Sequence, residues 1–189
     1  MYQKYNTDAI VLGGRERGDA DKVFALYTRD FGLVYARASA VRAEKSKMRY
    51  ALQSYAHARV SLVRGSRGWR AAGASCHVAG LEGKGLVAFA RIAALVSRLV
   101  AGEERNEYLF DTLAQAHASL IAASDETIPT IELVCAARIL YALGYLSAEA
   151  IDSAILTHTA YGFEHIREAH SLRDSLLASV NRALSETHL

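Results

Sequence analysis

The residue types that bind phosphates and nucleotide bases gather in one short segment of this chain. Between residues 37 and 49, five basic side chains stand against a single acid, Glu44. The basic residues are Arg37, Arg42, Lys45, Lys47 and Arg49. Ser46 can donate a hydrogen bond to a phosphate, and Tyr35 and Tyr50 flank the segment. Cations along a backbone path and aromatic faces for base stacking are what a single-strand binding groove requires, so we predict a nucleic-acid interface here.

A second basic group extends this candidate interface. Arg64 and Arg67 lie in a turn that precedes Trp69. Alternation of polar and apolar residues favours an exposed Tyr35, with a place in the core as the alternative. For Tyr50 and Trp69 the sequence does not decide between exposure and a place in the core. No arrangement of these side chains forms a code for base edges, so we expect little sequence specificity.

Signatures of catalysis and of metal binding are missing from the sequence. Residues 13–18 are glycine-rich but lack the Lys-Ser/Thr ending of a phosphate-binding loop. Neither Gly-x-Ser-x-Gly nor His-Glu-x-x-His occurs. Cys76 and Cys135 lie far apart without a Cys-x-x-Cys partner, and the apolar surroundings of Cys135 predict a small buried side chain. We therefore expect no catalytic residues, no cofactor and no metal.

Composition excludes several broad classes of protein. The 189 residues are 51% hydrophobic with a formal net charge of +2, which argues against a disordered chain. Two cysteines are too few for a disulfide scaffold, and no apolar run reaches the roughly 18 residues of a membrane span. The first residues lack an apolar signal core. We expect a cytoplasmic, nucleoid-associated protein without a membrane partner.

Charge and periodicity divide the chain into two parts. Residues 1–75 carry fourteen Lys/Arg and six Asp/Glu, a net +8, whereas residues 76–189 carry a net −6. This contrast favours a polyanion-binding module joined to a second part with another role. The alternative is that solvent-exposed charges are unevenly distributed along the chain without a functional reason. With residues 80–85 as the junction, we predict a basic nucleic-acid-binding domain over 1–79 and an acidic helical domain, for protein interaction or structure, over 80–189.

Short strands are predicted in the first part and helices in the second. Five candidate strands, at 8–12, 23–28, 33–38, 56–62 and 69–74, suggest a small closed barrel. Phe24, Tyr27 and Phe31 are expected in its core, and His57 on the polar face of its strand. Apolar residues at helical spacing follow over 89–99 and 109–120. Pro129 and Gly144 mark the start and end of a central helix, and Ser171 to Asp174 has the form of a capping box before a last helix.

An ordered set of motifs over residues 7–70 resembles the opening of the RecO family of bacterial recombination mediators. The motifs are Thr7-Asp8-Ala9-Ile10-Val11-Leu12, Arg17-Gly18-Asp19-Ala20-Asp21-Lys22 and Tyr27-Thr28-Arg29-Asp30-Phe31-Gly32, followed by Lys45-Ser46-Lys47 and Leu52-Gln53. The resemblance implies an α+β protein, with a five-stranded OB-fold barrel followed by an all-α helical domain. It also implies a non-catalytic role in recombinational repair. Such proteins bind single- and double-stranded DNA, anneal complementary strands and, with RecR, load RecA onto strands coated by single-strand-binding protein (SSB).

The sequence departs from this family in two respects. Many members carry a four-cysteine zinc element in the second domain, which two cysteines cannot form, so we predict no zinc. The family also binds the acidic C-terminal tail of SSB through its helical domain, which is net acidic here and needs a local basic and apolar pocket for that tail. The alternatives are an OB-fold adaptor for a protein partner and an RNA-binding module, neither with a DNA-annealing role.

Overall fold

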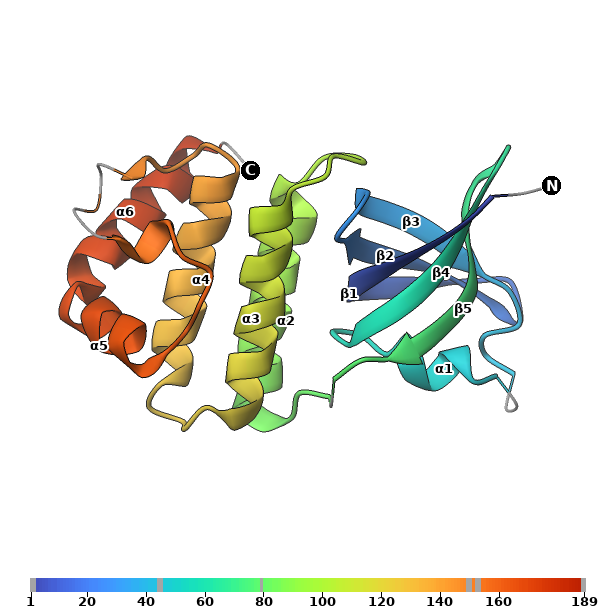
Figure 1. Ribbon diagram of the computed structural model, residues 1–189, viewed down its shortest axis with the longest axis horizontal. Coiled ribbons are helices and arrows are strands. Elements are labelled where there is room, and N and C mark those ends of the chain that lie inside the picture. The colour runs from blue at the N-terminus through green and yellow to red at the C-terminus, as the bar shows by residue number, and fades with distance from the viewer. Residues whose placement is uncertain (1–2, 44–45, 79, 149–150, 152–153, 188–189) are drawn as a thin grey trace. The chain divides into compact units, whose positions relative to one another are not determined.

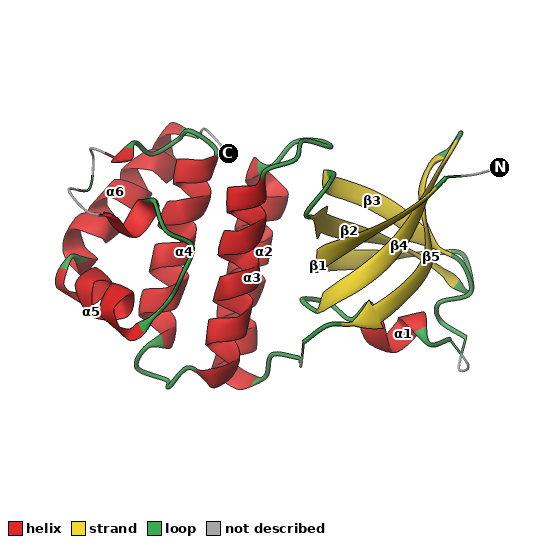
Figure 2. Cartoon of the chain, viewed as in Figure 1, coloured by secondary structure: helices red, strands yellow, loops and turns green. Residues whose placement is uncertain are grey.

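The computed structural model describes residues 3–43, 46–78, 80–148, 151 and 154–187. The chain forms two compact units. One contains Met1–Gly80 together with Ala101–Glu107, and the other contains Leu81–Val100 together with Tyr108–Leu189. Among the described residues, the strands all lie in the first unit, where α1 (Met48–Ala51) is the accompanying helix (Figure 2).

Five strands close into a barrel in the first unit. They are β1 (Lys4–Arg17), β2 (Asp21–Thr28), β3 (Gly32–Ala38), β4 (His57–Gly65) and β5 (Gly68–Cys76). Their order around the barrel is β1-β2-β3-β5-β4, with β3 and β5 parallel and the other neighbours antiparallel. This is the OB-fold arrangement, in which α1 connects β3 to β4. The predicted barrel followed by helices, and the α+β class, are therefore confirmed.

Strand β1 belongs to both halves of the barrel. Its residues Lys4–Ile10 pair with β4 and its residues Ala9–Arg17 pair with β2, with a register shift between Val11 and Gly13. Such an irregularity bends a strand, so that one strand can pair with two neighbours around the closed barrel. Residues 13–17, which are glycine-rich in sequence, are therefore strand rather than loop.

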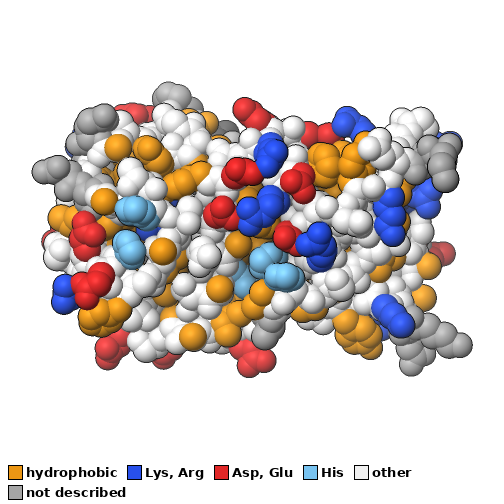
Figure 3. Space-filling model, in the orientation of Figure 1, with side chains coloured by type: hydrophobic (Ala, Val, Ile, Leu, Met, Phe, Trp, Pro, Cys, Tyr) orange, Lys and Arg blue, Asp and Glu red, His pale blue; other side chains and the backbone are white. Residues whose placement is uncertain are grey.

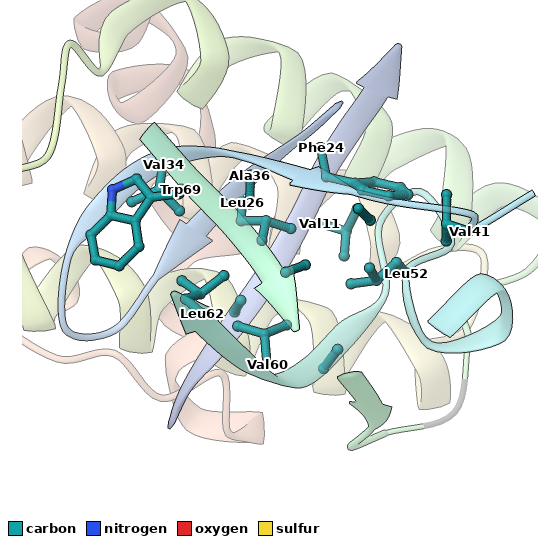
Figure 4. Packing of buried hydrophobic residues seen from close by; sticks show 14 of the residues in the cluster. Val11, Phe24, Leu26, Val34, Ala36, Val41, Leu52, Val60, Leu62 and Trp69 are labelled. Carbon is teal, nitrogen blue, oxygen red and sulfur yellow. The ribbon is translucent and has the colours of Figure 1, made fainter. Parts of the chain in front are cut away.

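The barrel core consists of side chains that alternate along the strands. Val34, Ala36 and Ala38 of β3 point inward, whereas Tyr35 and Arg37 point outward, as the alternation predicts. Phe24, Val41 and Leu52 lie together at one end of this cluster, and Trp69 lies at the other (Figure 4). The Trp69 ring packs against the rings of Tyr5 and Phe31, with ring centroids 5.7 and 5.0 Å away.

The second unit is built around one apolar helix. Its helices are α2 (Gly83–Leu99), α3 (Glu107–Ala122), α4 (Ile128–Ala142), the short 3₁₀ helix η2 (Ala154–Leu156), α5 (Phe163–Ser171) and α6 (Arg173–Glu186). Helix α4 contacts α2, α5, α6 and η2, and is largely buried (Figure 1). Pro129 lies in its first turn, and Gly144, at φ +79°, follows its end, as predicted. No helix in the described part of the chain is both long and apolar enough to cross a membrane.

The capping box predicted at Ser171 is wrong. Ser171 is the last residue of α5, and its hydroxyl donates backward to the Glu168 carbonyl at 2.7 Å. The residue before α6 is Leu172, which makes no side-chain capping bond. The Ser171 hydroxyl therefore bonds within the last turn of α5 and does not cap α6.

The connection between α2 and α3 packs with the barrel. The Leu33 amide, near the start of β3, donates to the Gly102 carbonyl at 3.3 Å. Gly32 has φ +64°, and a Cβ there would lie 2.2 Å from the Glu104 carbonyl oxygen. Glycine is therefore required at this position both by its conformation and by the close backbone. Residues 101–107 contain one arginine and three glutamates, which lowers the net charge of the barrel unit from +8 to +6.

Candidate nucleic-acid interface

The outer face of β3 and β5 combines an exposed ring with two arginines. Tyr35 is 59% exposed, and Arg37 lies two residues further along the same face. Arg37 is the register partner of Arg70 on parallel β5, and both are exposed. Partners on adjacent strands project from the same side of a sheet at a separation of about 5 Å. The barrel part of the surface visible in Figure 3, at the right, shows mainly Lys and Arg among its charged side chains.

Asp21 orients Arg37. Its Oδ2 accepts hydrogen bonds from Arg37 Nε at 2.8 Å and Nη2 at 2.5 Å, and its Oδ1 accepts the Ala40 amide at 2.9 Å. The Ala40 bond, and then the Arg37 bond, lower the pKa of the Asp21 carboxyl below its usual value. The carboxylate therefore stays ionised and holds the guanidinium at the β1–β2 turn, while the Arg37 side chain remains 44% exposed.

Arg42 contacts the other side of the same turn. Its backbone amide donates to the Ala20 carbonyl at 3.1 Å, and its Nη1 lies 3.2 Å from Glu16 Oε2 and 3.4 Å from the Gly18 carbonyl. The β1–β2 turn thus brings Arg37 and Arg42 to one region of the barrel.

Three further predicted residues of this segment lie at or near α1. Lys47 and Arg49 are exposed and Ser46 is half-buried, whereas Lys45 lies outside the described residues. Tyr50 is 64% exposed, with the Arg49 guanidinium 5.8 Å from its ring centroid.

A pocket of about 490 Å³ opens at the mouth of the barrel beside α1. Three cations line it, namely Lys22, Arg42 and Arg49. The other lining residues are Gly14, Phe24, Val41, Leu52, Gln53 and Ser54, so none of the described lining residues is an acid. We call this cavity the mouth pocket. Lys22 is not among the predicted interface residues, although it shares a face of β2 with Phe24.

Arg64 and Arg67 occupy different environments on the β4–β5 hairpin. Arg64 lies over the Trp69 ring, 5.2 Å from its centroid, and its Nη1 is 3.3 Å from Glu103 Oε2. Arg67 is exposed in the two-residue turn between the strands. Trp69 itself is buried, which leaves Tyr35 and Tyr50, both exposed, as the aromatic faces of this interface.

Two expectations about histidine and cysteine can be compared with the structure. His57, expected on a polar strand face, is buried, because the chain after β5 covers it with the His77 ring at 5.0 Å. Cys135 is fully buried as predicted, and burial raises the pKa of its thiol to about 12. Within the described ranges, no group of three or more His, Cys, Asp or Glu residues is placed to hold a metal ion.

Comparison with known proteins finds a family to which the barrel is similar. Residues 1–70 match the family model described as "Recombination protein O N terminal". The barrel is therefore similar to the N-terminal domain of RecO proteins. The resemblance seen in the sequence is thereby confirmed for the barrel.

Two relatives show how far the RecO match extends. DNA repair protein RecO of Pelotomaculum thermopropionicum is 41% identical, and that of Desulfitobacterium hafniense strain DSM 10664 / DCB-2 is 36% identical, each over 61 residues. These alignments cover 32% of this chain and 24% and 22% of the two relatives. The chain thus matches about a quarter of the relatives' length, and the helical unit lies outside the RecO match.

The helical unit carries a groove of its own. It has a volume of about 380 Å³ and lies between α2, α4 and α6. The lining residues are Arg91, Ile92, Ala94, Leu95, Arg98, Glu132, Ala136 and Leu184. Arg91 is held by Glu132 through two hydrogen bonds of 2.5 and 2.6 Å, which raise the pKa of the guanidinium. Arg98 is exposed at the end of α2. This groove, which we call the helical groove, is both basic and apolar.

Proposed function

We propose that this chain is a non-catalytic, DNA-binding recombination mediator. It would bind single- and double-stranded DNA, anneal complementary strands and, together with RecR, promote loading of RecA onto SSB-coated single strands. The RecO match of the barrel supports a role in DNA repair. The details of this role rest on the side chains of the barrel.

The observation that carries the proposal is the pairing of Arg37 with Arg70 beside the exposed Tyr35. Like charges at neighbouring positions of a sheet repel each other and lower stability. Asp21 forms an ion pair with Arg37. A phosphate backbone that passes over this face would neutralise both arginines, and Tyr35 would then stack a base.

Strand annealing follows from the same contacts without an active site. Arginines and lysines that neutralise phosphates reduce the repulsion between two strands. Because these contacts engage the backbone, the base edges stay free to pair with a complementary strand. We therefore expect binding with little dependence on sequence.

The test is anisotropy of labelled single-stranded and duplex DNA across a salt series with the full chain. A strand that contacts about five phosphates should give a log–log slope near −3.5, because each contributes about −0.7. Changing Arg37, Arg67 and Arg70 to Gln should reduce the magnitude of the slope by about 2. Changing Arg98, Arg173 and Arg182 to Gln removes the same charge from the helical unit and should leave the slope unchanged.

Four outcomes would contradict the proposal. Affinity that is insensitive to salt, or equal slopes in the two triple variants, would remove the barrel cations from the interface. Clearly tighter binding of RNA than of DNA would favour the RNA-binding module, which reads the 2′-hydroxyl. Failure of DNA to compete with a protein partner would favour the adaptor.

We also propose that the helical groove takes the acidic C-terminal tail of SSB. Arg98 supplies a cation, and Ile92, Leu95 and Leu184 supply apolar surface for hydrophobic residues of the tail. A labelled tail peptide should bind the wild-type chain, and Arg98→Glu should weaken binding at least tenfold. Arg173→Glu, on an exposed position of α6, is the matched control. Equal binding to both variants would exclude the groove as the tail site.

A further inference from the structure

The mouth pocket differs from the outer face of the barrel in shape and charge. We propose that it binds the terminal phosphate of a DNA strand, a monoester, while the outer face holds the strand itself. This inference rests on the proposed DNA binding and adds a preference for phosphorylated strand ends.

The first argument is charge. Lys22, Arg42 and Arg49 converge on one cavity without an acid among its described lining residues. Glu16, the ion-pair partner of Arg42, does not line the cavity. A phosphate monoester carries about −1.5 to −2 at neutral pH, against −1 for a phosphodiester. Three cations around one site therefore favour the end of a strand over a group within it, and the arginine forks suit phosphate oxygens.

The second argument is shape. The floor of the pocket consists of Phe24, Val41 and Leu52, which belong to the packed core. A cavity that ends on the core admits a chain end or a single protruding group, whereas a continuous strand needs an open passage. The volume of about 490 Å³ falls within the range of sites that take small ligands.

The third argument is the placement of Tyr50. Its exposed ring lies beside Arg49, which lines the pocket. A terminal nucleotide can therefore place its phosphate among the three cations and stack its base on Tyr50. Gln53 and Ser54 at the rim add hydrogen-bond donors for the phosphate or the sugar.

The experiment compares three single strands of one sequence, each labelled internally. They carry a 5′-phosphate, a 3′-phosphate, or hydroxyls at both ends. At least one phosphorylated strand should bind about tenfold more tightly than the dihydroxyl strand. This ratio should fall to about one in Lys22→Gln and, independently, in Arg49→Gln. Lys84→Gln, an exposed lysine of α2 that pairs with Asp125, should retain it.

The other possible outcomes show whether the pocket proposal fails alone or together with the proposed DNA binding. Equal binding of all three strands by the wild-type chain would overturn the pocket proposal and leave DNA binding intact. No binding of any strand would overturn both. A deoxynucleoside 5′-monophosphate should compete only weakly, because it lacks the strand that the outer face holds. If it bound as tightly as a phosphorylated strand, the pocket would be a site for free nucleotides, and the strand-end proposal would be wrong.

Discussion

One arginine of the helical unit, Arg138, is used in the opposite way from the surface arginines of the barrel. In the barrel, Arg37 and Arg42 form ion pairs yet keep their side chains 44% and 38% exposed. In the helical unit, Arg138 of α4 is fully buried. A guanidinium at the surface can exchange its protein partner for a ligand, whereas a buried guanidinium keeps its protein partners and stabilises the fold. Net charge alone does not distinguish these two roles.

Arg138 shows what the buried role requires. Its Nε donates to the Ile155 carbonyl at 2.8 Å, and its two terminal nitrogens donate to Thr159 and Ala160 carbonyls at 3.0 Å. The guanidinium lies 4.5 Å from the centroid of Tyr161, whose hydroxyl pKa is raised well above its usual value by burial. One arginine thus ties the segment from Ile155 to Tyr161 to α4.

The two cysteines provide the largest contrast between the units. Cys76, at the end of β5, is exposed, whereas Cys135 on α4 is buried with a raised thiol pKa. A thiol reagent should modify Cys76 rapidly and Cys135 at least about a thousandfold more slowly, because the unit must first open at a cost of about 5 kcal/mol or more. Absorbance with a disulfide reagent measures both phases. Equal rates in the native protein would show that α4 is not packed as described, and in denaturant both rates should converge.

Arg138→Ala should destabilise the helical unit by about 3–5 kcal/mol, because three carbonyls, one of them on buried Ile155, lose their donor and the Tyr161 ring loses its neighbour. Urea unfolding followed through Cys135 labelling measures this loss. The control is Arg37→Ala, which removes an exposed ion pair and should cost about 0–1 kcal/mol. Similar losses in the two variants would remove the distinction between the arginines of the two units.

Gly32→Ala tests whether the α2–α3 connection belongs to the barrel. Alanine at φ +64° costs about 1–2 kcal/mol, and its Cβ would meet the Glu104 backbone, which cannot move aside as a side chain would. We expect a total loss of about 2–4 kcal/mol in the free energy of unfolding. Gly18→Ala is the matched control, because φ there is +66° and nothing lies within 4 Å of the added Cβ. Equal losses in calorimetry would show that residues 101–107 do not pack on this turn.

Features that depend on local pattern could be predicted from the sequence. The alternation of β3 correctly placed Tyr35 outward, and Pro129 and Gly144 marked the ends of α4. Features made by distant segments could not. The mouth pocket joins residues from 14 to 54 only once the barrel closes, so Lys22 gave no signal as a single residue. Similarly, nothing local shows that residues 101–107 pack with strands some seventy positions earlier.

The smallest expected effect concerns how charge acts at a distance. Glu103 brings a carboxylate from the α2–α3 connection to Arg64 on the barrel, in an ion pair whose side chains are 39% and 62% exposed. Glu103→Gln should therefore raise the affinity for single-stranded DNA by about two- to fivefold at low salt, since exposed pairs contribute about 0–1 kcal/mol. The gain should vanish at high salt, where screening removes it. Anisotropy across the salt series measures it.

Glu164→Gln provides the control for this last effect, because Glu164 pairs with Arg167 on α5 and its loss changes the net charge equally. If binding follows the local field of the barrel, Glu164→Gln should leave DNA affinity unchanged while Glu103→Gln raises it. If both variants gained equally, the net charge of the whole chain would govern binding. The polarity between a basic barrel and an acidic helical unit would then have no part in how this protein meets DNA.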